Sequence, residues 1–334
     1  MSAKFIFVII GGFIVIAVAG VFILLQPKPA EIEQRIPEGY HCTGSGIIAY
    51  TLYDSGGKLQ IFTAKSDGTS KRQLTFEGVS GRPDFSPDGK KIAFISVRPA
   101  AKGPEVWVMD ADGSNQKSLG EGVTPDWSPD GKSIAFALNN QIWVMTADGT
   151  ERKQVTSSPT SKIGPSWSPD GKQMVFILVK NPASQTHPQP EIGIMNSDGT
   201  NEMILTSEDR TNVRKNPDGT TTVLETAYDA NAPAWSPAED KVAFWSGIET
   251  QYGQIWVISA DGTESKQLTE DPNHRNSDDP SWSPDGKKIL FSTGRGGRNE
   301  LWVMDADGEN ERKLFEIDAA PFPGRASWQP VCDQ

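Results

Sequence analysis

The sequence contains little cysteine and histidine, with two Cys and three His in 334 residues. Two cysteines exclude a disulfide-dense scaffold and a zinc site built from four thiolates. The three histidines, His41, His187 and His274, leave little material for a histidine-based metal centre. We therefore expect the protein to have no bound metal and no cofactor.

Catalytic motifs and positive charge are also scarce. The sequence has no Gly-x-Ser-x-Gly elbow, no His-Glu-x-x-His and no phosphate-binding P-loop. Lys and Arg total 32 against 43 Asp and Glu, so the formal net charge is −11. A chain of this charge is a poor match for a nucleic-acid backbone, which binds proteins largely through Lys and Arg. These absences argue against a nucleic-acid partner and favour a protein that is not an enzyme.

The chain has one long apolar run, Phe5 to Leu25, which carries no charged and no polar side chain. About 20 apolar residues span the hydrocarbon core of a bilayer as a helix. We predict a transmembrane signal-anchor over residues 5–25, a cytoplasmic tip over 1–4 and a linker over 26–41. A cleaved signal peptide, with Ala17-Val18-Ala19 as its cleavage site, and a buried helix are the alternatives. Anchor and signal peptide both place residues 26–334 outside the cytoplasm, on the periplasmic or extracellular side.

The rest of the chain is rich in turn residues and repeats one phrase. Gly (32) and Pro (24) are abundant, which favours a mostly β protein. The phrase Pro-x-aromatic-Ser-Pro, in most copies followed by Asp-Gly-Lys, centres on Phe85, Trp127, Trp167, Trp235 and Trp282, and a truncated copy centres on Trp328. Most copies are separated by roughly 40–50 residues, a period that indicates a propeller or a solenoid.

Each repeat has the same order of segments. The Ser-Pro-Asp-Gly turn leads to a short apolar run such as Ile92-Ala93-Phe94, then to a run ending in Asp-Gly, then to one ending in Leu-Thr or similar. Four short strands per repeat are expected, apolar on both faces because blades pack between neighbouring blades. Proline cannot donate to a β-ladder, so the Pro-x-aromatic strand should be an edge, here the innermost strand. The third strands carry six residues in one matched position: Phe62, Trp107, Trp143, Gly193, Trp256 and Trp302.

The end of the chain supplies the strand that the first repeat lacks. Trp328-Gln329-Pro330 should complete a first blade formed by Ile47–Tyr53, Leu59–Lys65 and Lys71–Thr75. The prediction is an all-β, six-bladed β-propeller over residues 42–334, closed by its C-terminal strand and preceded by one transmembrane helix. On the repeat alignment Cys42 and Cys332 should meet, and an exported domain permits a disulfide between them.

The repeat unit resembles the PD40 (WD40-like) repeat of TolB-like six-bladed β-propellers. The resemblance covers roughly residues 43–332 and implies this propeller fold. TolB carries an α/β domain ahead of its propeller, whereas here only the linker separates the apolar run from the first blade. Similar propellers accompany prolyl-oligopeptidase-like peptidases, but the hydrolase domain of those enzymes has no counterpart in this sequence.

Two places are candidate sites. The connections after the second and fourth strands vary and should share one face, whereas the short Asp-Gly turns occupy the other. The variable ones are Pro99–Pro104, Lys180–Glu191, Ser207–Ala232, Gly247–Gly253, Glu270–Asp279 and Gly294–Asn299. Loops on a rigid scaffold often carry recognition. The long Ser207–Ala232 insertion should contain an extra hairpin that is either a recognition element or a neutral excursion.

The second place is the mouth of the central channel. Its candidate ligand-binding residues lie on the innermost strands: Arg82, Asp84, Asp126, Asp279 and Arg325. Two arginines side by side would bind a carboxylate or a small anion. Alternatively, these charges only discourage pairing of exposed strand edges. A cation site formed by Asp271, His274, Asp278 and Asp279 is a further and weaker alternative.

The sequence therefore favours a membrane-anchored, extracytoplasmic propeller that acts as a non-catalytic scaffold. Its partner would be a protein or a cell-envelope polymer bound on the variable loop face, and the propeller would act as a monomer. The alternatives are a polysaccharide lyase or hydrolase working at the channel mouth, and a structural surface protein without a specific ligand.

Overall fold

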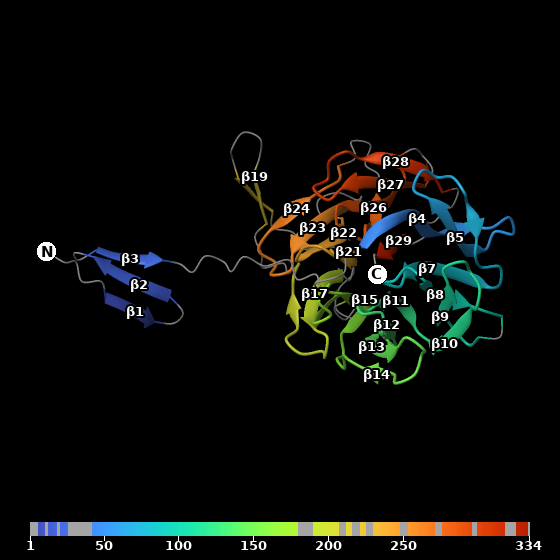
Figure 1. The fold of residues 1–334 in the computed structure, drawn as a ribbon, viewed down its shortest axis with the longest axis horizontal. Coiled ribbons are helices and arrows are strands. Elements are labelled where there is room, and N and C mark those ends of the chain that lie inside the picture. The colour runs from blue at the N-terminus through green and yellow to red at the C-terminus, as the bar shows by residue number, and fades with distance from the viewer. Residues whose placement is uncertain are drawn as a thin grey trace. The chain divides into compact units, whose positions relative to one another are not determined.

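Residues 42 to 332 form six four-stranded antiparallel sheets arranged as the blades of a propeller (Figure 1). The computed structural model describes these parts of the chain: 6–10, 13–18, 21–25, 42–99, 101–179, 190–206, 212–215, 221–224, 230–247, 253–270, 276–295, 299–317 and 325–332. The chain divides into two units, Met1–Arg35 and Ile36–Gln334. The expected propeller is thus confirmed in the second unit.

Each blade follows the strand order that the repeats predict. Blade one consists of β29 (Ser327–Cys332), β4 (Cys42–Tyr53), β5 (Leu59–Lys65) and β6 (Arg72–Gln73). Blade two consists of β7 (Val79–Phe85), β8 (Lys91–Val97), β9 (Glu105–Asp110) and β10 (Lys117–Glu121). Blade three consists of β11 (Val123–Trp127), β12 (Ser133–Leu138), β13 (Gln141–Thr146) and β14 (Lys153–Gln154).

The second half of the ring repeats this arrangement. Blade four consists of β15 (Ser161–Trp167), β16 (Gln173–Val179), β17 (Pro190–Asn196) and β18 (Met203–Ile204). Blade five consists of β21 (Ala230–Trp235), β22 (Lys241–Ser246), β23 (Gln254–Ser259) and β24 (Ser265–Gln267). Blade six consists of β25 (Ser277–Trp282), β26 (Lys288–Thr293), β27 (Glu300–Asp305) and β28 (Arg312–Glu316). The expected extra hairpin is present as β19 (Asn212–Lys215) and β20 (Thr221–Leu224).

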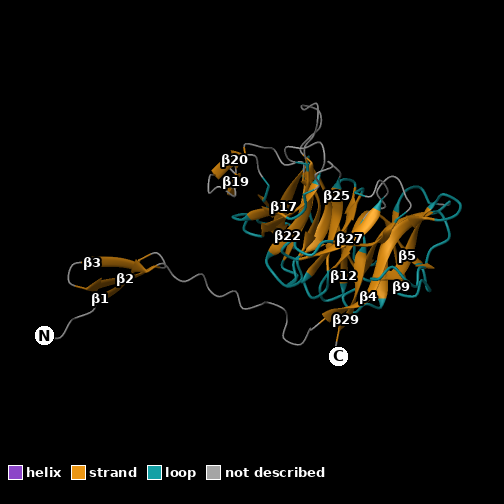
Figure 2. Cartoon of the chain, turned by 90° about the horizontal axis from the view of Figure 1, so that it is seen from above, coloured by secondary structure: helices purple, strands orange, loops and turns teal. Residues whose placement is uncertain are grey.

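The strand that carries Pro-x-aromatic is the innermost strand of every blade. These strands contact one another around a full circle, from β29 through β7, β11, β15, β21 and β25 back to β29. Figure 1 shows β29, β7, β11, β15 and β21 near the centre of the ring, and Figure 2 shows the blades from the side. The C-terminal strand β29 pairs with β4 and so completes blade one with the last residues of the chain. Closure of the ring leaves no open edge between the first and last blades.

Aromatic pairs fill the spaces between blades. The second strands each bury one ring to 1% exposure or less: Tyr50, Phe94, Phe136, Phe176, Phe244 and Phe291. Each lies opposite the predicted third-strand position, as in the pairs Phe94–Trp107 and Phe136–Trp143. In blade four the partner of Phe176 is Gly193 instead of an aromatic residue. The apolar clusters join neighbouring blades, which explains why the strands are apolar on both faces.

The acidic turns are stabilised by their own side chains. In the first of them, Asp88 Oδ1 accepts hydrogen bonds from Ser86 Oγ at 2.6 Å and from the Lys90 N–H at 3.0 Å. In the other type of turn, hydrogen bonds from Thr146 and Thr150 lower the pKa of Asp148 to about 2. In both turns the Asp accepts hydrogen bonds from the residues two positions before and two positions after it, a local pattern typical of Asp in tight turns. Local turn chemistry therefore accounts for the Asp-Gly phrases.

The helix expected over residues 5–25 is not shown by the structure. The segment forms three antiparallel strands, β1 (Ile6–Ile10), β2 (Phe13–Val18) and β3 (Val21–Leu25). It is rich in Ile and Val, whose branched side chains favour strands, and the sequence places Gly11 and Gly12 between β1 and β2. Among the described residues, no helix has the length and apolarity needed to cross a membrane.

Candidate functional site

The innermost strands share a bulge at the position three residues before the aromatic. The pairing register shifts there in blades two to six, for example between Gly81 and Asp84. The residue at this position has a positive φ in each of these blades: Arg82 (51°), Thr124 (52°), Gly164 (60°), Ala232 (52°) and Asp279 (51°). A non-glycine residue pays roughly 1–2 kcal/mol for this conformation.

The strand pattern in the sequence did not predict this bulge, although the proline in each repeat is a signal for it. Proline is found at bulges as well as on edge strands, and Pro83, like its counterparts, directly follows the residue of positive φ. Because the same bulge recurs in blades two to six, the variable residue of each of these innermost strands occupies an equivalent backbone position. Arg82 and Asp279 are two of these residues.

In several repeats the residue directly before the aromatic joins neighbouring blades. Asp84 Oδ2 accepts a hydrogen bond from the Trp127 N–H at 3.0 Å, and Asp126 Oδ2 accepts one from the Trp167 N–H at 2.9 Å. Ser327 Oγ accepts from the Phe85 N–H at 3.1 Å in the same way. The two carboxyl groups predicted as ligand-binding therefore have a structural contact that spans the gap between blades.

Arg325 contacts a carboxyl group two blades away. Its Nη1 lies 3.4 Å from Asp126 Oδ1, and the Asp126 side chain is buried. Burial, then the charge of Asp84, raises the pKa of Asp126 to about 7, against the opposing effect of Arg325. Burial also raises the pKa of Asp84, again opposed by Arg325. One guanidinium thus faces two buried carboxyl groups, and the protonation of each group depends on the other.

Arg82 belongs to a second acidic group. Burial and the charge of Asp279 raise the pKa of Asp278 to about 7, and the nearby Arg82 opposes this rise. Asp278 Oδ1 also accepts a hydrogen bond from the Asp279 N–H at 2.8 Å. The sequence pattern predicted Arg82 and Asp279 at the channel mouth but did not indicate Asp278 there. The structure gives Arg82 and Arg325 separate acidic neighbours, Asp278 and Asp126.

The structure offers no support for the cation-site alternative. Asp271 and His274 lie outside the described residues. Within the part of the chain that is described, no group of three or more His, Cys, Asp or Glu residues is placed to hold a metal ion.

The variable face, defined by the connections after the second and fourth strands, is described only in part. Residues 99 and 101–104 are described, whereas the other five predicted connections extend outside the described residues. A further connection on this face, from β6 to β7, is fully described, and sequence analysis did not single it out. It contains Phe76, whose exposed fraction is 70%.

Three exposed apolar side chains lie in this connection or on the strands beside it. Val79 and Val97 are 45% and 41% exposed and lie directly opposite each other on β7 and β8. With Phe76 they form what we call the apolar patch. After Leu-Thr or Val-Thr, the other repeats have Ser157, Ser207 or Glu270 at the position of Phe76. An aromatic residue where the repeat is otherwise polar was a signal available in the sequence.

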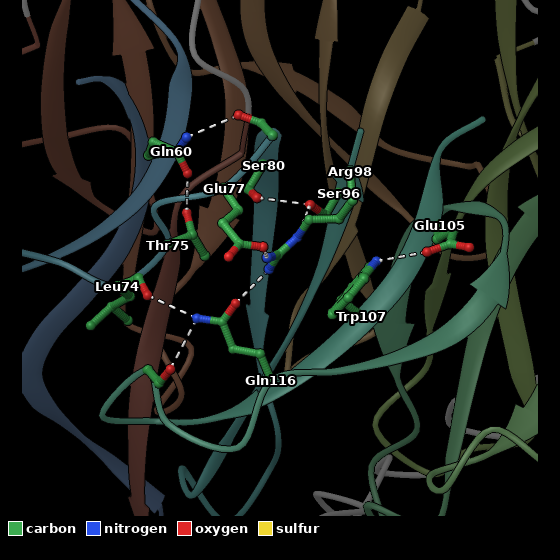
Figure 3. A network of polar contacts seen from close by, with 12 residues as sticks. Gln60, Leu74, Thr75, Glu77, Ser80, Ser96, Arg98, Glu105, Trp107 and Gln116 are labelled. Carbon is green, nitrogen blue, oxygen red and sulfur yellow. Dashed lines mark hydrogen bonds and ion pairs between the residues drawn. The ribbon is translucent and has the colours of Figure 1, made fainter. Parts of the chain in front are cut away.

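A polar network holds the two residues that flank Phe76, Thr75 and Glu77 (Figure 3). Thr75 Oγ1 donates to Gln60 Oε1 at 2.6 Å, and Gln60 Nε2 donates to the Gly78 carbonyl at 3.0 Å. Arg98 Nη1 lies 2.6 Å from Glu77 Oε2, and Arg98 Nη2 donates to Gln116 Oε1 at 2.5 Å. The loop that carries Phe76 is thereby held at both ends by residues of blades one and two.

Arg98 is the centre of this network. Its guanidinium carbon lies 4.3 Å from the centre of the Trp107 ring, and its Nε donates to Ser96 Oγ at 3.2 Å. Gln116 Nε2 in turn donates to the Leu74 carbonyl at 3.0 Å. Figure 3 shows the Arg98 guanidinium beside Glu77 and Gln116, with Gln116 reaching toward Leu74. An exposed aromatic on such a rigid support loses little conformational entropy on binding a partner.

Fold and site together define a six-bladed β-propeller with a charged channel mouth and a loop face. The PD40 family pattern, described as the TolB beta propeller domain, matches residues 48–228 and 216–327. The chain belongs to this family.

Individual relatives match the chain at low sequence identity or over only part of its length. The chain is 32% identical over 93 residues to the Tol-Pal system protein TolB of Anaeromyxobacter dehalogenans, a match that covers 27% of this chain and 20% of that protein. The crystal structure of TolB from Acinetobacter baumannii superposes with a TM-score of 0.62 at 20% identity, covering 92% of this chain and 75% of that one. An oligogalacturonate lyase in complex with manganese gives 0.51 at 16% identity, covering 84% and 76%. The two structures share the fold with this chain.

Proposed function

We propose that the protein is a membrane-tethered, extracytoplasmic scaffold that binds a protein partner on its variable face. The apolar patch of Phe76, Val79 and Val97 carries this proposal. Aromatic residues in well-supported positions dominate the energy of protein interfaces. A Phe that is 70% exposed buries little of its apolar surface in the blade that bears it, and the equivalent positions of other repeats are polar. An apolar contact of this kind favours a protein over a hydrophilic envelope polymer.

The route of the chain through the propeller supports this orientation. β4 begins at Cys42, at the end of blade one that lies beside the Ser-Pro-Asp-Gly turn of blade two, where Gln329 Nε2 donates to the Gly89 carbonyl at 2.9 Å. We call this side the turn face. A tether attached before residue 42 therefore enters on the turn face and leaves the variable face, on the opposite side, accessible.

The tether in this proposal is the apolar segment over residues 5–25. An open three-stranded sheet has two edge strands with unpaired N–H and C=O groups, which are costly in hydrocarbon. Inside a bilayer the segment would therefore be a helix, in which every backbone group is paired within the segment. Residues 1–4 would then be cytoplasmic, and residues 26–41 would link the membrane to the propeller.

Extraction of membranes at alkaline pH, with N-terminal sequencing of the product, tests the tether. The anchor predicts that the protein stays in the membrane fraction with Met1 or Ser2 at its N-terminus. A start close to residue 20 would instead identify a cleaved signal peptide, and full release with an intact N-terminus would contradict both.

Photo-crosslinking tests the binding face directly. A photoreactive phenylalanine is placed at position 76, and in a matched control at Val331, which is 45% exposed on the last strand. In the native membrane we expect a crosslinked protein from position 76 and none from position 331. Phe76→Ser, the residue of two other repeats, should abolish capture, whereas Met203→Ser, a change at another exposed apolar residue, should not. Equal labelling at positions 76 and 331 would refute the proposal, and a crosslinked glycan would indicate a polymer ligand.

A second candidate function is acid–base chemistry on a glycan at the channel mouth. Carboxyl groups with a pKa near 7, such as Asp126 and Asp278, are suited to proton transfer at neutral pH, and one similar structure is a lyase. Turnover of acidic oligosaccharides, lost in Asp278→Asn and retained in Phe76→Ser, would favour the enzyme. No turnover together with capture at position 76 would favour the scaffold.

A further inference from the structure

The two cysteines of the chain lie on opposite strands of the closing pair in blade one. β29 pairs with β4 through Pro330–Gly44, Val331–Thr43 and Cys332–Cys42, so the cysteines form the last rung of the ladder. The chain has two Cys in total. The repeat alignment predicted that they meet, but it did not predict that they would stand directly opposite each other.

Pro330 indicates which kind of rung the cysteines occupy. In an antiparallel pair, opposed residues alternate between rungs that exchange two N–H···O bonds and rungs that exchange none. Proline has no N–H and therefore fits a rung without hydrogen bonds. Cys332 is two residues beyond Pro330 in the same uninterrupted register, so the Cys332–Cys42 rung is of the same kind. Such rungs bring the two Cα atoms to about 4.5 Å, within the roughly 4.4–6.8 Å that a disulfide requires.

We infer that Cys42 and Cys332 form a disulfide that covalently closes the propeller between its first and last strands. In the forming reaction, one cysteine thiolate attacks a disulfide oxidant and makes a mixed disulfide. This first attack releases one thiol of the oxidant, and the other cysteine thiolate then displaces the second, so the oxidant leaves as two thiols that carry the two electrons and two protons. The inference depends on the proposed function only for the oxidising compartment.

The position of the bond gives it a mechanical role. The Cys42–Cys332 rung is on the turn face, where the linker enters the propeller, and it is the first rung that a pull on the linker would open. Without a covalent bond, β4 could separate from β29 one rung at a time, beginning there. With the bond, a force from the tether reaches both strands together and the ring stays closed. The bond therefore connects the attachment point to the closure of the ring.

The test uses full-length protein purified in detergent after thiols are blocked by alkylation. Digestion without reductant should yield one peptide pair joining Cys42 to Cys332, and intact mass should show no alkylated cysteine. Because the closed loop contains about 290 residues, reduction should lower the melting temperature by about 5–10 °C. The double variant Cys42→Ala/Cys332→Ala should melt at the temperature of the reduced protein, with no response to reductant.

Several results would overturn the inference. Two alkylated thiols in protein incubated with oxidised glutathione would show that the pair does not bond. A linked dimer of two chains would show that the cysteines bond between molecules. An unchanged melting temperature on reduction of a mapped bond would overturn the closing role. Capture at position 76, measured on the double variant, separates these failures from a failure of the proposed function, since that capture does not need the bond.

Discussion

Removal of the Trp328 side chain tests whether the C-terminal strand is an integral part of blade one. Trp328 is 8% exposed and packs in a cluster with Ile48, Tyr50 and Phe315, residues of blade one and of blade six. A buried Trp removes about 200 Å² from water, which at ~25 cal/mol per Å² corresponds to about 5 kcal/mol. Its indole N–H is buried without a hydrogen-bond partner within the described part of the chain. Truncation therefore also removes the free-energy cost of this unpaired N–H group, about 1 kcal/mol.

We therefore expect Trp328→Ala to lower the free energy of unfolding by about 4 kcal/mol, within the range usual for Trp truncation in cores. The melting temperature should fall by about 8–16 °C. The assay is urea and thermal unfolding followed by far-UV circular dichroism, because fluorescence would itself change with the loss of one Trp.

Val331→Ala is the matched control on the same strand. Val331 is 45% exposed, so its truncation should change the free energy of unfolding by about 0.5 kcal/mol or less. If Trp328→Ala and Val331→Ala unfolded alike, β29 would not be part of the cooperative fold. The assignment of innermost strands and faces in blade one would then be wrong.

Two further predictions concern the core and the channel mouth. A Cβ at Gly193 would lie 2.5 Å from Phe176 Cζ, so Gly193→Ala should lower the free energy of unfolding in urea by about 1–3 kcal/mol. Gly103 has open space around it, so Gly103→Ala should leave the free energy of unfolding unchanged. Equal stability of the two variants would contradict the packing of blade four. The pKa of Asp126 is raised in the folded state to about 7, so this carboxyl supports the fold most below about pH 4, and its contribution is lost as the pH rises toward 7. Between pH 5 and pH 8 the urea midpoint should therefore fall in the wild type by more than it falls in Asp126→Asn. The difference should correspond to at least about 1 kcal/mol of unfolding free energy. Parallel pH profiles of the two proteins would show that Asp126 does not cause the loss of stability.

Sequence alone determined the architecture of the propeller because its information is local and repeated. Each signal extends over only a few residues and recurs along the chain. These signals are the Pro-x-aromatic strand, the Ser-Pro-Asp-Gly turn and the Asp-Gly turn. Trp328-Gln329-Pro330, a spare first strand, was therefore sufficient to predict closure of the ring. The extra hairpin at β19 and β20 was predicted for the same reason, from a longer spacing and a turn sequence.

The candidate site depended on contacts between blades, which no local pattern specifies. The pairing of Arg325 with Asp126 joins residues from blades one and three, and the raised pKa of Asp278 results from burial and from a neighbour at the channel mouth. The positive φ of Ala232 is imposed by the bulge, because alanine has no preference for that conformation. Such features arise only when six sheets close around one axis.

The N-terminal segment shows the opposite limit. Its apolar run fits a spanning helix by length and a strand by its Ile and Val content, and the structure has β1, β2 and β3 there. Whether the segment forms a helix or strands depends on whether lipid or water surrounds it, and the sequence alone does not determine the surroundings. For the propeller, the sequence determined which strands exist and in what order they pair. Only the tertiary structure decided which charges meet across the channel, that Phe76 is held exposed, and that Cys42 lies opposite Cys332, because each of these depends on contacts between residues that are far apart in the sequence.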